Sequence, residues 1–343
     1  MATSFKTFIN NDVTTTRTLL HESIPVTGNI VNTTYSDNNI KNYAHGIFQS
    51  VYDYPYLSSS ANHIFDIAVG ISPSSALSSS STVQNAKKIN MYNQMAQVLV
   101  GHDITGGILQ FDADGDMLAG GNKLKEVIFI NLARLLTKDE IKKDSFDLQL
   151  GTGSTYAAPM ANLKLLGDHG AANDFRVNSP AGEYAPLYTS SANVTADTGL
   201  GLIYYQAGIA VISASVFNGI EFSGSNGSGS SIDSALTSST IEVIADAFRN
   251  RFADLDFNNT TELNSTIYFC RVNHNEFNYS ANPTYLSESK IRVKQNSVDT
   301  PVTYITTVGM YSADNELLAV SKLSEPLKKD PTNELVLRVR LDF

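Results

Sequence analysis

The stretch VTYITTVGMYSADNELLAVSKLSEPLKKDPTNELVLRVRLDF, residues 302–343, decides the fold class of this chain. It is rich in valine, threonine, isoleucine and tyrosine, which favour strands, and the turn SADNE separates its first two strands. The upstream segments STIYFCRV and KIRVKQ have the same character. The five segments predict a compact β unit over 262–343. Its expected core residues are Ile305, Val308, Leu318, Val320, Leu335 and Leu337.

Composition narrows the class of protein. A chain of 343 residues predicts two domains or one long mixed domain. With 42% apolar and 17% charged residues, disorder of the whole chain is excluded. A formal charge of −10 argues against a nucleic-acid partner, because binding to phosphates depends on clustered basic residues. Cys270 is the single cysteine, so no internal disulfide can form, and we expect it to be a small buried side chain in a strand.

The same composition gives expectations about targeting. The first twenty residues lack the apolar core and the small-residue cleavage pattern of a signal peptide. The sequence contains no run of about 18 consecutive apolar residues, so it predicts no membrane helix. We therefore expect a soluble, non-secretory protein without a membrane partner.

Several segments upstream of the last unit have residue patterns that predict a type of secondary structure. Residues 1–60 contain strand formers broken by Pro25 and Gly28, which predicts an extended N-terminal arm of short strands. The stretch 84–101 has helical spacing and ends at a glycine. EVIFINLARLL at 126–136 suits a strand buried on both faces, and GLIYYQAGIAVIS at 201–213 predicts a hairpin.

The clearest helix is predicted over 240–256. Ser239 and Glu242 have the spacing of a capping box, and Arg249 is expected on the polar face, toward solvent or a neighbour. The apolar stripe consists of Ile241, Ile244, Phe248, Phe252 and Leu255. The predicted fold class is α+β, mainly β, with short-stranded antiparallel sheets, two or more packed helices and an extended N-terminal arm. The expected domains are the arm at 1–60, a mixed α+β body at 61–261 and a C-terminal β-module at 262–343.

Three aspartates, Asp112, Asp114 and Asp116, have the alternate spacing of a calcium loop. The rest of that pattern fails, because the glycine position holds Met117 and the bidentate carboxylate position holds Lys123. We expect an acidic hairpin tip in solvent. The nine residues FDADGDMLA at 111–119 parallel YSADNELLA at 311–319, which leaves open whether the two hairpins are duplicated units.

Two His-Asp neighbours, His102-Asp103 and Asp168-His169, are the other candidates for chemistry. A dinuclear metal site needs more ligands at workable spacing, and the chain has no nucleophile elbow, phosphate loop or dinucleotide fingerprint. The sequence therefore predicts no catalytic, cofactor-binding or metal-binding residue, no cofactor and no enzymatic activity.

A cluster of tyrosines surrounds Pro55. Aromatic side chains with polar tips suit a buried protein contact, although ordinary packing explains them equally well. The candidate contact residues are Tyr43, Tyr52, Tyr54 and Tyr56.

The C-terminal stretch resembles the terminal β-module of structural proteins from contractile-tailed bacteriophages. In those proteins a similar sequence motif precedes the last strand. The matching positions are Val308, Gly309, Tyr311, Asp314, Leu317, Leu318, Ala319, Val320, Lys322 and Leu323. Residues 127–146 and 201–213 have a similar character. The resemblance implies a virion protein of the tail, baseplate or neck that is made in the host cytoplasm and acts by assembly. Its expected partners are other virion proteins and copies of itself in a symmetric particle.

Two functions from other classes stay open. One is a receptor- or glycan-binding protein of a fibre or capsid surface, with the tyrosine cluster and residues 151–200 as binding loops. The other is a virion-associated hydrolase that uses His102-Asp103 and the acidic hairpin.

Overall fold

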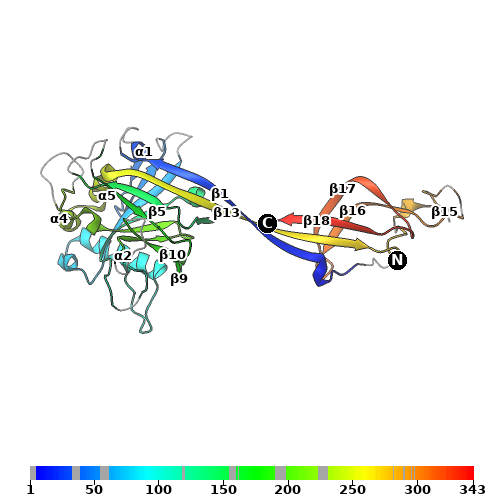
Figure 1. Ribbon diagram of the computed structural model, residues 1–343, viewed down its shortest axis with the longest axis horizontal. Helices are drawn as coiled ribbons and strands as arrows, with labels where there is room; N and C mark the ends of the chain where they lie inside the picture. Colours follow the sequence, from blue (N-terminus) through cyan, green and yellow to red (C-terminus); the bar gives the residue numbers. More distant parts are fainter. Residues whose placement is uncertain are drawn as a thin grey trace. The chain divides into compact units, whose positions relative to one another are not determined.

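The computed structural model describes residues 5–32, 39–54, 62–117, 120–153, 160, 162–189, 198–222, 231–280, 282–288, 290–294, 296 and 298–343. The chain divides into two compact units (Figure 1). We call Leu20–Thr261 the body. Residues Met1–Leu19 and Glu262–Phe343 together form the second, which we call the terminal unit. The arm expected over 1–60 is thus divided between the two.

The predicted α+β, mainly β fold class is confirmed. The body contains an antiparallel sheet of eight strands in the order β2-β3-β4-β5-β12-β11-β10-β9. The strands are β2 (Ile40–Asn42), β3 (Phe48–Tyr52), β4 (His63–Ile71), β5 (Glu126–Leu132), β9 (Arg176–Ser179), β10 (Gly182–Leu187), β11 (Gly201–Tyr204) and β12 (Ile209–Ser213). β2 and β3 come from the expected arm, so that part of it is sheet, whereas β1 (Val13–Thr27) is one extended and mostly exposed strand.

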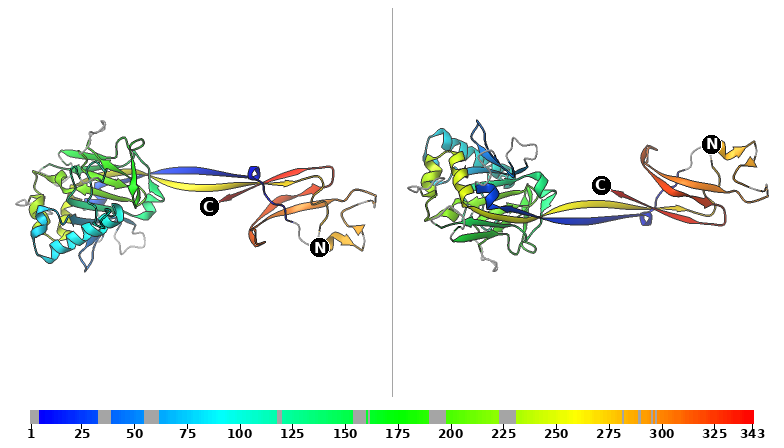
Figure 2. Two further views of the ribbon diagram at one scale, coloured as in Figure 1. Left: turned by 90° about the horizontal axis from the view of Figure 1, so that it is seen from below. Right: turned by 90° about the horizontal axis from the view of Figure 1, so that it is seen from above.

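Apolar side chains cover both faces of this sheet. On β5, Val127 and Phe129 belong to one buried cluster and Ile128 and Ile130 to the other, as expected for a strand buried on both faces. Helix α2 (Val83–Leu99) contributes side chains to the first cluster, and α5 (Ile241–Arg251) contributes to the second. Figures 1 and 2 show where the two helices lie. The two helices therefore cover opposite faces of the sheet.

Helix α2 fits the sequence prediction closely. Thr82 caps its N-terminus, and Gly101 follows its C-terminus with φ of 94°. Gly70 of β4 lies beneath it, where a Cβ atom would come within 2.7 Å of the Phe129 ring. Lys88 is fully buried and donates to the carbonyls of Leu236 and Ser239, while burial lowers its pKa to about 8.

Helix α5 is shorter than predicted. It ends at Arg251, because Phe252 begins strand β13 (Phe252–Val272) and pairs with Leu150. The strand pairing overrides the helical period, so Phe252 and Leu255 are buried as strand residues. The other helices are α1 (Gly28–Asn32), α3 (Arg134–Thr137) and α4 (Ile232–Ser238), with 3₁₀ turns η1 (Asn10–Asp12), η3 (Ala76–Ser79), η4 (Ala214–Phe217) and η5 (Pro283–Tyr285).

Two further details of this helix differ from the prediction. The N-cap is Thr240, whose side chain accepts from the Val243 amide, and Ser239 instead ends α4. Arg249 was expected to point outward, but it donates to the Gln49 side chain at 2.7 Å and to the Val31 carbonyl at 2.9 Å. It therefore ties α5 to β3 and α1.

A second sheet is organised around β13, which contributes residues to both units. In the body, β13 pairs with β7 (Asp147–Gly151) and β6 (Glu140–Ile141), and β7 pairs with β8 (Leu163–Gly167). β13 also pairs with β1. In the terminal unit, residues 265–272 of β13 pair with β18 (Leu335–Asp342).

The rest of the terminal unit is a long hairpin, drawn in orange in Figure 2, and a short one. The long hairpin consists of β16 (Thr303–Tyr311) and β17 (Leu317–Lys329), and its turn contains Asn315 with φ of 63°. The short hairpin consists of β14 (Leu286–Ser287) and β15 (Lys290–Ile291). The corresponding earlier segment, 111–119, differs, because the pairing described around it is limited to isolated bridges such as Asp112 to Lys123.

The expected compact core of the last unit is wrong. Both buried apolar clusters consist of body residues alone. Leu318 is 69% exposed and Val320 is 53% exposed. The other expected core residues, Ile305, Val308, Leu335 and Leu337, are half-buried. The strands form as predicted, but among the described residues no second layer covers the face that carries Leu318 and Val320.

The described residues contain no helix that is both long and apolar enough to cross a membrane.

Phe248 tests the packing of α5. Its ring is fully buried and packs edge-on against Phe217, with ring centroids 6.0 Å apart. Phe248→Ala should lower the free energy of unfolding by about 3–5 kcal/mol, because a large cavity remains. Urea denaturation measures the loss, with Val243→Ala on the exposed side of the same helix as control. A loss equal to that of the control would mean that α5 does not pack as described.

Candidate functional site

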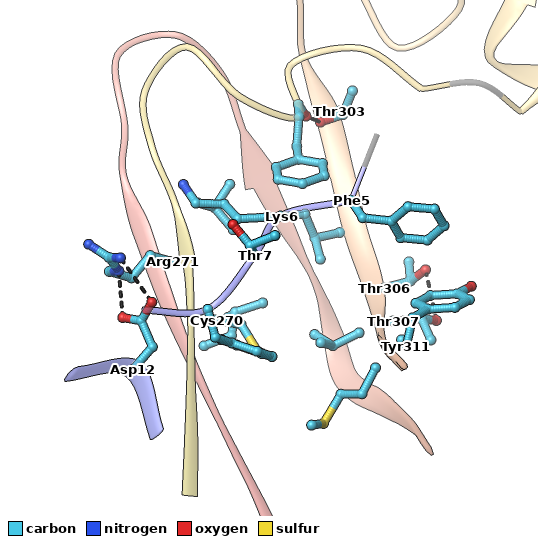
Figure 3. Close-up of a pocket in the computed structure, with 18 of the residues that line it drawn as sticks. Phe5, Lys6, Thr7, Asp12, Cys270, Arg271, Thr303, Thr306, Thr307 and Tyr311 are labelled. Carbon is cyan, nitrogen blue, oxygen red and sulfur yellow. Dashed lines mark hydrogen bonds and ion pairs between the residues drawn. The ribbon is translucent and has the colours of Figure 1, made fainter. Parts of the chain in front are cut away.

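The terminal unit contains an open groove of about 660 Å³. The N-terminal segment 5–8, the end of β13, residues 277–280 and strand β16 line it. Figure 3 shows Phe5, Lys6 and Thr7 crossing the groove, with Thr306, Thr307 and Tyr311 of β16 along one side. The groove has the volume of a typical ligand or side-chain binding site.

Strand β16 contributes to the groove along its whole length. Successive residues of a strand point to opposite faces, yet every residue from Thr303 to Ala313 contributes to the lining. One edge of β16 bonds to β17. For the opposite edge, no backbone partner is found among the described residues. This edge of β16 therefore has a row of peptide groups that another strand could pair with.

Two ion pairs fix the N-terminal segment on its side of the groove. Arg271 Nε lies 2.7 Å from Asp12 Oδ1, and Arg271 Nη2 donates to Asp12 Oδ2 at 2.9 Å. The hydrogen bond from Arg271 lowers the pKa of the Asp12 carboxyl. Lys6 pairs with Glu276 and likewise lowers the pKa of that carboxyl. The segment is thus held as a wall of the groove, and the aromatic contact between Phe5 and Tyr311, with centroids 4.8 Å apart, connects it to β16.

Cys270 lies in the groove and is half-buried, which corrects the expectation of a fully buried cysteine. Burial raises the pKa of its thiol, so the thiol stays protonated at neutral pH. This environment is the opposite of the one that activates a nucleophilic cysteine.

The three aspartates of the acidic hairpin come together in the body. One carboxylate oxygen of each lies within 4.8 Å of the others, which is the geometry of a candidate cation site. Asp112 is buried, with 1% of its surface exposed, and this corrects the expectation of a tip in solvent. It forms an ion pair with Lys123, which occupies the position where a calcium loop has its bidentate carboxylate. The lysine ammonium therefore already supplies positive charge to this cluster.

The His-Asp neighbours do not form a site with these acids in the described residues. His102 and Asp103 are exposed, and the Asp103 carboxylate accepts from the amides of Thr105 and Gly107. Asp168 is buried and accepts from the Tyr205 hydroxyl at 2.8 Å and from two backbone amides. Its role is to hold the loop before β7.

The tyrosines lie in the body. The Tyr43 ring stacks on His45 with centroids 5.1 Å apart, and Tyr52 contacts His63 at 5.4 Å. Tyr54 is exposed. Tyr56 lies outside the described residues. The contact role of the four residues stays a prediction.

Comparisons with known proteins add no family to this description. No family model, curated protein or solved structure matches the chain.

Sequence reasoning did not find the groove. Its lining comes from four separate segments, and the pairing of Asp12 with Arg271 joins residues that are 259 positions apart. One signal was available. β16 has nine residues without a charge or a proline, which is unusual for a strand with a free edge.

The pH dependence of stability tests the burial of Asp112. Burial raises the pKa of this carboxyl from 3.8 to about 6, so the folded chain binds its proton more tightly than the unfolded chain does. Between about pH 4 and 6 this group therefore makes stability fall as pH rises. Asp112→Asn should remove that component, as measured by urea denaturation across this range.

Asp103→Asn provides the control, because hydrogen bonds lower the pKa of Asp103 and its contribution has the opposite sign. If wild type and Asp112→Asn showed parallel pH profiles, the carboxyl would not be desolvated.

Proposed function

We propose that this chain is a structural protein that acts by assembly, and that the terminal unit is its assembly element. The observation that carries the proposal is the distribution of apolar surface. Sixteen of the twenty-five large apolar side chains exposed among the described residues lie in the terminal unit, which holds 101 of the 343 residues. Protein surfaces that present such patches are usually covered by a partner.

Packing within the terminal unit supports the same reading. Its buried apolar side chains, among the residues described there, are Val272, Tyr285, Met310 and Val339, each 7–8% exposed. The body, by contrast, has many apolar side chains with no exposed surface. An isolated two-stranded hairpin is marginally stable in water, so β16 and β17 gain stability when another layer covers them.

The particle to which we assign the chain is the virion of a contractile-tailed bacteriophage, in a tail, baseplate or neck position. The sequence resemblance over 302–343 supports this assignment, because its matching residues lie on β16, the turn and β17. Leu318 and Val320, which belong to this sequence motif, are exposed on the hairpin of β16 and β17. Two of the residues that carry the resemblance thus lie where a partner could reach them.

Receptor or glycan binding is the second candidate. It is favoured by an aromatic cluster in the body, where Tyr43, His45 and Phe48 contact one another at 4.9–5.1 Å and Lys41 lies 5.0 Å from the Tyr43 ring. Aromatic side chains with polar tips suit a contact that is partly apolar and partly polar, as a ligand surface is. We do not propose hydrolysis, because the acidic cluster is occupied by Lys123 and His102 is exposed elsewhere in its loop.

Incorporation into particles tests the assembly proposal. Replacing Leu318 and Val320 together by Asp should change the free energy of unfolding of the free chain by about 0.5 kcal/mol or less per site, because both side chains are exposed. The same variant should fail to enter particles in infected cells, as measured by the amount of the chain in purified virions.

The matched control replaces Val98 and Ile104 by Asp, two apolar side chains of the body that are also exposed. Normal incorporation of the Leu318 and Val320 variant would contradict the proposal, and so would an unmodified chain that is absent from purified virions.

A further inference from the structure

We infer that the partner along β16 is a second copy of this chain, and that the β16 strands of two copies pair antiparallel across a twofold axis. This inference rests on the proposed assembly function and names the partner. It is carried by three observations: the lack of charged residues in β16, the charge of the terminal unit, and the groove that β16 lines.

β16 lacks the charged residues that β17 and β18 carry. Natural proteins protect free strand edges with charges, prolines and bulges. β17 carries Lys322 and Pro326, whereas the register irregularities at Ile305/Thr307 and Met310/Tyr311 lie in the edge that β16 and β17 share. β18 carries Arg338 and Arg340. The sequence of β16, TYITTVGMY, has neither a charge nor a proline.

An uncharged strand of this composition has a strong tendency to pair with another strand. Thr306 and Thr307, at the middle of β16, are exposed. A chain with such an edge avoids aggregation when one specific strand pairs with the edge. Pairing of a strand with its own copy meets this condition in a closed way, because an antiparallel pair of identical strands is twofold symmetric and leaves no free β16 edge.

The charge of the terminal unit favours a second copy over a charged partner. The terminal unit contains eleven basic and eleven acidic side chains, so its formal charge is zero. The body contains thirteen basic and twenty-three acidic side chains and thus carries the whole net charge of −10. Two terminal units can approach without net repulsion, whereas two bodies repel each other.

The groove contains apolar and aromatic side chains that a second copy would cover. Its lining along β16 includes half-buried Val308 and exposed Tyr304 and Tyr311. A strand added at this edge, beside the N-terminal segment, would shield these side chains from water. The backbone would supply affinity, and the side chains in the groove would fix the register.

A charge-swap experiment on the full chain identifies the occupant. Thr306→Lys and Thr306→Glu each place a charge near the twofold axis, so each variant alone should be monomeric in sedimentation velocity while wild type is dimeric. An equal mixture of the two variants should recover the dimer, because the charges then attract. The control Ser324→Lys places the same charge on the exposed part of β17 and should leave the dimer intact.

Circular dichroism confirms that each variant is folded. A wild-type chain that stays monomeric at its highest soluble concentration would overturn the inference, as would dimers that persist in both single variants. If a wild-type chain that is monomeric in solution still entered virions, self-pairing would fail while the proposed function stood. If it did not enter them, both would fail. Mixing that does not restore the dimer would also overturn pairing through β16.

Discussion

A sheet is stable in water only when a second layer covers its apolar face, and the two units of this chain meet that requirement differently. In the body, β5 contributes Phe129 to one covered face and Ile130 to the other, and α2 and α5 supply the layers. In the terminal unit the strands form, but Leu318 and Val320 on β17 have no described layer over them. The proposed assembly role would supply that cover from outside the chain, which connects the fold of the terminal unit to the proposed function.

The spacing of apolar residues was sufficient to predict those helices and strands in which long-range packing follows the same spacing. The helix α2 and the β11–β12 hairpin were predicted because capping residues, turn residues and apolar spacing all agree in these segments. The end of α5 could not be predicted, because Phe252 continues the helical stripe and only its pairing with Leu150 makes it a strand residue. The core of the terminal unit was predicted wrongly for a related reason. Alternating apolar residues indicate a strand face, but they do not reveal whether the same chain covers it.

The candidate sites show the same limit. The spacing of Asp112, Asp114 and Asp116 brought the three carboxylates together as expected for one loop. Their environment depends on Lys123, which lies on the returning segment, and on the burial of Asp112. The groove depends on an ion pair between Asp12 and Arg271 at opposite ends of the sequence. Short-range patterns predict the members of a loop, whereas long-range pairing decides their chemistry.

Amide hydrogen exchange at several protein concentrations tests the central claim most directly, namely that the exposed strands of the terminal unit are covered by a partner copy. Exchange at β16 should slow as concentration rises, because pairing protects its outward amides, while exchange in β5 of the body should stay constant. Protection of β16 that does not change with concentration would contradict the account.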